Sequence, residues 1–242
     1  MLSKIEDGSI DLIVTDPPYF QISKQSWDNK WKNYDEFLIW LNDIIIGCYD
    51  KLKDNGSMYI FTAFGEEFNK LVNMIFNTKF NVTNMLMWQR SPPGRKHSKT
   101  RYTLNYEFVW FLTKDNYVFN LDDVRIPQNY KDKRNNPKGK NPGSIWYYPN
   151  LMIGRNKKQL GHPTQKPEEL IERMILASSN KGDIILDPFL GSGTTMAVTQ
   201  KLERSCIGSE TNLDYCEIIK KRCNPEIYNT SHTNVTKGEG TE

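Results

Sequence analysis

The stretch Ile184-Ile185-Leu186-Asp187-Pro188-Phe189-Leu190-Gly191-Ser192-Gly193-Thr194-Thr195 indicates the fold class most directly. Its apolar start is typical of a buried strand, and its two glycines precede a helical pattern over 194–202. Glycines at such a junction let the backbone approach a ligand and leave N–H groups open at a helix N-terminus. Neither a phosphate loop, which needs Gly-Lys-Ser/Thr, nor a three-glycine dinucleotide fingerprint is present. The stretch therefore predicts a strand–loop–helix unit that binds some other ligand.

The segments on both sides of this unit alternate between strand and helix patterns. Apolar runs predict strands over 10–15, 58–61, 82–88, 108–112, 184–186 and 206–208, the fourth antiparallel to the third. Helical spacing of apolar residues predicts helices over 34–53, 66–76, 167–179, 194–202 and 213–222. Asn55-Gly56 is expected to end the first helix. The pattern predicts an α/β doubly wound, mostly parallel sheet with an antiparallel hairpin, and a ligand crevice at the carboxyl ends of the strands.

A second polar motif, Asp16-Pro17-Pro18-Tyr19, follows the strand predicted over 10–15. Proline fixes φ and lacks a backbone donor, so the carbonyls of this corner face few competing N–H groups. Such a corner can bind a planar ring that carries an amino group. Asp16 and a carbonyl would accept its two hydrogens, and Tyr19 would stack on the ring. Taken alone, the motif is equally consistent with a turn that ends a strand.

Two further segments complete the set of motifs. Glu210 follows the strand predicted over 206–208, where an acidic side chain can accept both hydroxyls of a ribose. The segment His162-Pro163-Thr164-Gln165-Lys166-Pro167 opens the helix predicted over 167–179.

Together these motifs resemble those of the amino-methylating DNA methyltransferases, which use S-adenosylmethionine. In that family D-P-P-Y is the catalytic motif and D-P-F-x-G-S-G-T-T the cofactor loop, while a segment like 162–167 helps to enclose the methionine end of the cofactor. The stretch 207–215 is similar to the ribose-binding segment of the family. The resemblance covers about residues 10–223, and its motif order is that of the circularly permuted β group, which has a Rossmann-like fold.

The resemblance implies methyl transfer to an amino group of a DNA base. Aspartate at the first motif position favours N6 of adenine, because cytosine-N4 enzymes more often carry serine there. The implied catalytic residues are Asp16, Pro17, Pro18 and Tyr19. The implied cofactor-binding residues are His162, Thr164, Lys166, Asp187, Pro188, Phe189, Gly191, Ser192, Gly193, Thr194, Thr195 and Glu210. A cytosine-N4 enzyme and a catalytically weak DNA-binding remnant are the alternatives.

The N-terminus departs from the pattern of the family. Members usually begin with another short strand and a Gly-Asp pair that contacts the adenine of the cofactor, whereas only residues 1–7 precede Gly8 here. We therefore expect one wall of the adenine pocket to be incomplete and cofactor affinity to be weak.

Charge is distributed unevenly along the chain. Residues 90–140 contain 12 Lys/Arg against 5 Asp/Glu, a local balance of +7, while the other residues sum to −4. A basic face suits a phosphate backbone, although most charge runs are only solvated. Given the family, DNA contact is predicted for Arg95, Lys96, Lys99, Arg101, Lys131, Lys133 and Arg134. Trp27 and Trp31 are expected either to cover a flipped-out base or to pack in the core.

The length of 242 residues fits one well-buried domain, or one domain with an insertion. We expect the catalytic half over 1–114, a target-recognition region without core elements over 115–150, the cofactor-binding half over 151–223 and a disordered tail over 224–242. The implied partner is DNA, as a duplex with a flipped-out base or as a single strand. A cognate restriction endonuclease and a homodimer are left open.

The composition also excludes some classes of protein. No apolar run reaches membrane-spanning length and no signal-peptide core is present, so we expect a cytoplasmic protein without a membrane partner. Cys48, Cys206, Cys216 and Cys223 lack paired metal spacing, and the three histidines are scattered. Reduced thiols and no metal site are expected.

Overall fold

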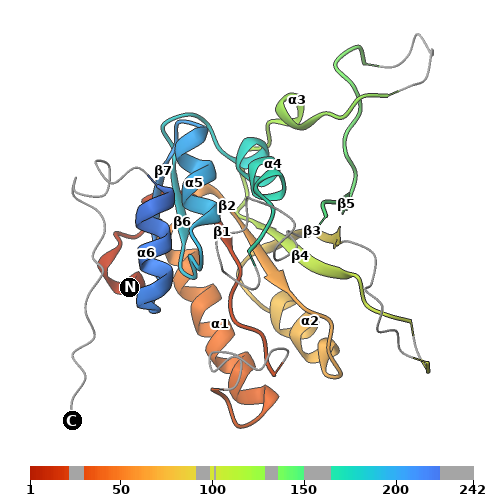
Figure 1. Cartoon of the computed structure of the whole chain (residues 1–242), viewed down its shortest axis with the longest axis vertical. Helices are drawn as coiled ribbons and strands as arrows, with labels where there is room; N and C mark the ends of the chain where they lie inside the picture. Colours follow the sequence, from red (N-terminus) through yellow and green to blue (C-terminus); the bar gives the residue numbers. More distant parts are fainter. Residues whose placement is uncertain (22–29, 91–98, 101, 129–135, 150–164, 224–242) are drawn as a thin grey trace.

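The structure is a computed structural model that describes residues 1–21, 30–90, 99–100, 102–128, 136–149 and 165–223. One mixed seven-stranded sheet runs through them in the order β5-β3-β4-β2-β1-β6-β7 (Figure 1). The strands are β1 (Ile10–Thr15), β2 (Leu52–Thr62), β3 (Asn81–Gln89), β4 (Tyr106–Thr113), β5 (Ile145–Tyr147), β6 (Ile184–Asp187) and β7 (Ser205–Gly208). The helices are α1 (Tyr34–Lys51), α2 (Phe68–Phe76), α3 (Leu121–Val124), α4 (Glu168–Ser178), α5 (Thr194–Lys201) and α6 (Leu213–Arg222). The predicted α/β class is confirmed.

The centre of the sheet is parallel and one side is antiparallel. β1 is parallel to both β2 and β6, and β7 is parallel to β6. β4 is antiparallel to β2 and β3, as predicted for the hairpin. From β1 the chain passes through α1 to β2, on one side of β1 in the sheet. From β6 it passes through α5, on the opposite face of the sheet, to β7, which lies in the opposite direction along the strand order. β1 and β6 therefore border the point where the winding reverses, which is where open α/β sheets bind their ligands.

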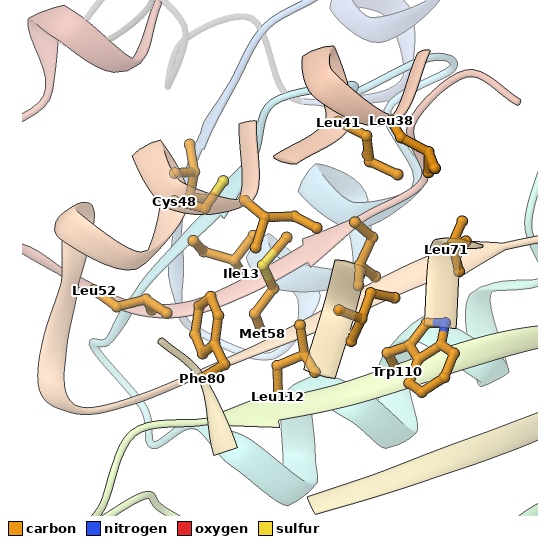
Figure 2. Close-up of a cluster of buried hydrophobic side chains, with 14 of the residues drawn as sticks. Ile13, Leu38, Leu41, Cys48, Leu52, Met58, Leu71, Phe80, Trp110 and Leu112 are labelled. Atoms are coloured by element: carbon orange, nitrogen blue, oxygen red, sulfur yellow. The ribbon is translucent and has the colours of Figure 1, made fainter. Parts of the chain in front are cut away.

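Helices cover both faces of the sheet, and each face has its own core. On one face α1 and α2 pack on β1, β2 and β4 through a cluster that includes Ile13, Leu41, Met58, Leu71 and Trp110 (Figure 2). On the other face α4 and α5 pack through the second cluster, which alternates with the first along the same strands. Since neighbouring strand residues point to opposite faces, a sheet buried on both sides reads as a continuous apolar run.

The first helix ends earlier than predicted. Asn33 caps its start, where the Asn33 side chain accepts from Glu36 N at 2.9 Å. The chain passes directly from Lys51 into β2, so the prediction that Asn55-Gly56 ends the helix is wrong. These two residues lie in an irregular part of β2, between the pairs Ile10↔Leu52 and Leu12↔Ser57. A bulge absorbs the turn-forming residues without ending the strand.

The expectation that 115–150 contains no core element is wrong for β5. This strand pairs in parallel with β3, and its central residue Trp146 is buried in the second cluster. The Trp146 indole N–H donates to Gly143 O at 2.8 Å, which satisfies its polar atom. Three residues are too short for a periodic pattern, so the sequence carried no strand signal there.

The structure describes the N-terminal residues of the chain but not its C-terminal tail. Residues 1–9 contain a 3-10 turn at Leu2–Lys4 and no strand. The tail predicted over 224–242 lies outside the described residues. No helix in the described ranges is both long enough and apolar enough to cross a membrane.

Candidate active site

Two polar motifs meet at the centre of the sheet. β1 and β6 are parallel neighbours, so the motif after β1 and the loop after β6 leave the sheet at the same edge. The Thr15 hydroxyl at the end of β1 donates to Asp187 Oδ1 at 3.1 Å, although the two residues are 172 positions apart in the sequence. The crevice predicted at the carboxyl ends of the strands is therefore present.

A cavity of about 510 Å³ opens at this edge. Its volume lies in the range of clefts that bind small ligands and cofactors. The predicted site residues that line it are Asp16, Pro17, Pro18, Tyr19, Lys166, Asp187, Pro188, Phe189, Gly191, Ser192, Thr194, Thr195 and Glu210. His162 and Thr164 lie outside the described residues. One cavity thus joins the catalytic motif to the predicted cofactor loop.

The glycine loop is a tight turn that opens α5. Gly193 stands at the N-cap with a φ of +78°, in the left-handed region that favours glycine. A Cβ at this position would come within 3.0 Å of Ile219 Cγ1 on α6. Leu190 N donates to Ser209 O at 2.9 Å and so holds the loop against the chain after β7. Gly193 does not line the cavity; it shapes the loop that does.

Glu210 follows β7 and its carboxylate folds back over the glycine loop. Its Oε2 accepts from Gly191 N at 2.9 Å, and its Oε1 accepts from Asn212 N at 2.7 Å. These two bonds fix the carboxylate at the wall of the cavity. Each oxygen keeps a second lone pair, so the group can also accept from ligand hydroxyls.

Asp187 is a buried carboxyl group at the base of the loop, with 4% of its surface exposed. Burial raises its pKa to about 7, and the nearby charge of Asp16 acts in the same direction. Hydrogen bonds from Thr195, Phe189 N and Thr15 oppose the rise. A cation placed beside a carboxyl group that titrates near neutral pH favours its ionised form and lowers its pKa.

The carboxylate of Asp16 has two close partners. The Tyr19 hydroxyl donates to Asp16 Oδ1 at 2.6 Å, and Lys166 Nζ lies 2.5 Å from Asp16 Oδ2. A second carboxylate joins them, since Glu107 Oε2 lies 3.2 Å from both the Tyr19 hydroxyl and Lys166 Nζ. Two carboxylates that line the cavity are thus bridged by an ammonium and a phenol, each of which contacts both of them.

The protonation states of this group follow from burial and charge. Burial raises the pKa of Tyr19 well above its usual value, and the carboxylates of Asp16 and Glu107 raise it further. Burial by itself lowers the pKa of Lys166, but the same two carboxylates outweigh it and the pKa is raised. Tyr19 is therefore a neutral donor at pH 7, and Lys166 is a cation.

The structure adds detail to two predicted roles. Lys166 was predicted among the cofactor residues, and its ammonium lies on the catalytic motif, at Asp16. Tyr19 was predicted to stack on a base; its hydroxyl binds two carboxylates, and the residue lines the cavity.

Glu107 and Arg90 are cavity residues that the sequence analysis missed. Glu107 lies on β4, just before the apolar run 108–112, and Arg90 follows β3. Arg90 Nη1 donates to Glu107 Oε1 at 3.1 Å. The sequence did contain a signal for Glu107, because a carboxylate next to a buried apolar strand needs a charged or hydrogen-bonding partner.

Aromatic side chains form another wall of the cavity. Trp40 of α1 packs against Phe189 with ring centroids 5.6 Å apart, and Trp31 packs against Trp40 at 4.6 Å. Trp31 also contacts Phe37 of the core at 5.0 Å. Both roles expected for Trp31, next to a bound base and in the core, are compatible with this position. Trp27 lies outside the described residues.

The predicted DNA contacts fall mostly outside the described residues. Lys99 is described and exposed. The others, Arg95, Lys96, Arg101, Lys131, Lys133 and Arg134, are not described. Their role stays a prediction.

In the described part of the chain, no cluster of three His, Cys, Asp or Glu side chains could hold a metal ion. The four cysteines have free thiols, and burial raises the pKa of the Cys48 thiol to about 12.

The fold and the site together define a class of protein: an α/β domain with a glycine-rich ligand loop at the winding switch and a D-P-P-Y motif in the same cavity. The family model described as DNA methylase matches residues 10–221. The chain belongs to this DNA methylase family.

Individual proteins similar to this chain are also methyltransferases. The Type II methyltransferase M.HpaI of Haemophilus parainfluenzae is 38% identical over 93% of this chain and 72% of its own length. The DNA adenine methyltransferase YhdJ of Escherichia coli (strain K12) is 37% identical over 91% of this chain and 78% of its own. The crystal structure of the M1.HpyAVI-SAM complex superposes with a TM-score of 0.62 at 28% identity, over 92% of this chain and 91% of that one.

Proposed function

We propose that this chain transfers a methyl group from S-adenosylmethionine to the N6 amino group of adenine in DNA. The observation that carries the proposal is the shared cavity, which Asp16-Pro17-Pro18-Tyr19 and the loop over 187–195 line together. Amino methylation needs an acceptor for the amino hydrogens beside a methyl donor, and this cavity offers both. Aspartate at position 16 favours adenine, in line with the similarity to YhdJ, a DNA adenine methyltransferase.

The residues on the cofactor side fit S-adenosylmethionine in their chemistry. Glu210 has lone pairs left for ribose hydroxyls, and Phe189 with Trp40 offers an apolar wall. Asp187 offers a carboxyl group whose ionised form a cationic ligand stabilises. When bound, S-adenosylmethionine supplies an electrophilic methyl group on a positively charged sulfur. His162 and Thr164 stay predicted contacts of its methionine end.

The chain contributes by positioning and activating the amino nitrogen of the base. That nitrogen is a poor nucleophile because its lone pair is delocalised into the ring. The Asp16 carboxylate and the Pro17 carbonyl accept its two hydrogens, which draws the nitrogen toward tetrahedral geometry and frees the lone pair. Tyr19 holds the base by stacking. Positioning supplies most of the acceleration, and no covalent bond to the enzyme is needed.

The target base has to leave its stack to reach the site. The side chain of Asp16 lines the cavity and is only 25% exposed, so a base paired inside a duplex cannot contact it. The substrate is therefore a flipped-out base or a single strand. We assign phosphate contact to the basic stretches after Arg90 and target recognition to residues 115–150. A cognate restriction endonuclease and a homodimer stay predictions about partners.

Nucleoside analysis after a transfer assay tests the proposal. The protein is incubated with S-adenosylmethionine carrying a tritiated methyl group and with DNA of mixed sequence, and the DNA is digested to nucleosides. Label is expected in N6-methyldeoxyadenosine. Label in N4-methyldeoxycytidine would replace the adenine assignment by its cytosine rival. No label, from a folded protein that binds the cofactor, would indicate a DNA-binding remnant.

A further inference from the structure

Four charged side chains of alternating sign, all of them lining the cavity, form a continuous row of contacts from Arg90 to Asp16. Arg90 Nη1 donates to Glu107 Oε1 at 3.1 Å, Glu107 Oε2 lies 3.2 Å from Lys166 Nζ, and Lys166 Nζ lies 2.5 Å from Asp16 Oδ2. The side chains of Glu107 and Lys166 are only 11% and 9% exposed. Charges this deeply buried depend on one another, because removal of one partner leaves the other uncompensated.

Both oxygens of Asp16 already accept a bond in this arrangement. Tyr19 donates to Oδ1 and Lys166 to Oδ2. An ammonium in direct contact lowers the negative potential that an amino hydrogen would meet, and it occupies space beside the carboxylate. Each oxygen keeps a lone pair, so Asp16 can accept a hydrogen of the target base, as the proposed function requires, but it accepts that hydrogen more strongly once one of these donors moves aside.

Glu107 offers a second acceptor to which the Lys166 ammonium and the Tyr19 hydroxyl can move. Its Oε2 is 3.2 Å from both donors, so a shift of less than an ångström turns each contact into a short hydrogen bond. Arg90 holds the other oxygen of Glu107, which fixes the carboxylate in its present direction. Without this second carboxylate, Lys166 could leave Asp16 only as an unpaired buried cation, at a large desolvation cost.

Aromatic rings limit how far the ammonium can travel. Lys166 Nζ lies 5.0 Å from the ring centre of Phe61, 5.5 Å from that of Trp88 and 5.9 Å from that of Tyr19. A cation is stabilised over such rings, and none of them competes with a carboxylate as a hydrogen-bond acceptor. The ammonium is thus confined to a small space whose two strong partners are Asp16 and Glu107.

We infer that Glu107 is a positioning residue for methyl transfer: it takes over Lys166 and the Tyr19 hydroxyl when the amino group of the target base binds Asp16. The inference rests on the proposed function and adds a residue outside both sequence motifs. It makes Lys166 a movable counter-ion of the catalytic carboxylate, in addition to any contact with the cofactor.

A double-mutant cycle between Glu107 and Lys166 tests this role. Single-turnover transfer rates are measured for the wild type, Glu107→Gln, Lys166→Met and the double variant, at saturating DNA and cofactor. Glu107→Gln is expected to lower the rate at least tenfold with the dissociation constant of the cofactor within threefold, because Lys166 then stays on Asp16. In the Lys166→Met background the same substitution is expected to change the rate less than threefold.

Additional variants separate this role from a structural one. Glu107→Asp keeps the charge and is expected to recover most of the rate that Glu107→Gln loses. If Glu107→Gln does not fold, Glu107→Ser, which also lacks the charge, replaces it in the cycle. Glu217→Gln, which removes an exposed partner of Lys220 on α6, is the matched control and should match the wild type. Equal losses in both Lys166 backgrounds, or no loss for Glu107→Gln alone, would overturn the inference. A folded wild type without any transfer would overturn the proposed function as well.

Discussion

The carboxyl group of Asp187 makes the stability of the protein depend on pH in a predictable direction. Its pKa is raised from the ordinary value of 3.8 to about 7, chiefly because the group is buried. The folded state therefore binds the proton more tightly than the unfolded state. The stabilisation is fully present below about pH 4 and is lost as the pH rises through about 7. Asp187→Asn removes the titrating group and keeps a side chain of the same shape.

The size of the effect follows from the shift. Raising the pKa from 3.8 to about 7 corresponds to about 4 kcal/mol at about 1.4 kcal/mol per pH unit. Relative to the wild type, the variant should be similar in stability near pH 4 and more stable by up to about 4 kcal/mol at pH 8. Because the hydrogen bonds from Thr15 and Phe189 N go to an oxygen that asparagine keeps, they should persist.

Urea unfolding at half-unit steps from pH 4 to pH 8, without cofactor, measures this difference. The free energies of unfolding of wild type and Asp187→Asn should diverge as the pH rises. Asp54→Asn, at an exposed position of β2, is the matched control and should run parallel to the wild type. Parallel curves for wild type and Asp187→Asn would refute the assignment of a buried carboxyl group with a raised pKa.

Three further substitutions test separate contacts. Gly193→Ala places a Cβ 3.0 Å from Ile219 at a φ of +78°, so thermal unfolding should show a loss of about 1–3 kcal/mol; an unchanged melting temperature contradicts the strained loop. Glu210→Gln should weaken cofactor binding about tenfold in calorimetry, since hydrogen bonds to charged groups contribute about 1.5–3 kcal/mol; unchanged affinity would move the ribose site elsewhere. Tyr59→Phe leaves the buried Ser178 hydroxyl without its partner at 2.9 Å, so the free energy of unfolding in urea should fall by about 1 kcal/mol. An unchanged free energy of unfolding would contradict a contribution of this hydrogen bond to stability.

The elements that could be predicted from sequence are those with long periodic patterns. The helix over 213–222 and the strand over 10–15 have the predicted bounds, because apolar spacing and clear end signals agree in both. β2 begins earlier than predicted, since turn residues at Asn55-Gly56 are absorbed in a bulge that only the pairing with β1 explains. β5 depends on its partner β3 and has no local pattern of its own.

The site could be predicted where it consists of contiguous motifs. Asp16 and Asp187 could each be predicted from the residues around them, and the parallel pairing of β1 with β6 brings both to one cavity. Glu107 could not be found in this way, because its role depends on Lys166 and Arg90, which reach it from different elements. Contacts across the sheet are set by strand order, and no spacing along the chain encodes them.

The comparison of methyl transfer with cofactor binding in Asp16→Ala tests the central claim most directly. Single-turnover transfer to DNA and the calorimetric dissociation constant of S-adenosylmethionine are measured on the same preparation. If Asp16 accepts the amino hydrogen of the base, transfer should fall by about 100-fold or more. Cofactor affinity should stay within about threefold, since the glycine loop and Glu210 are untouched. Transfer that survives the substitution, or an equal loss of transfer and binding, would contradict the account.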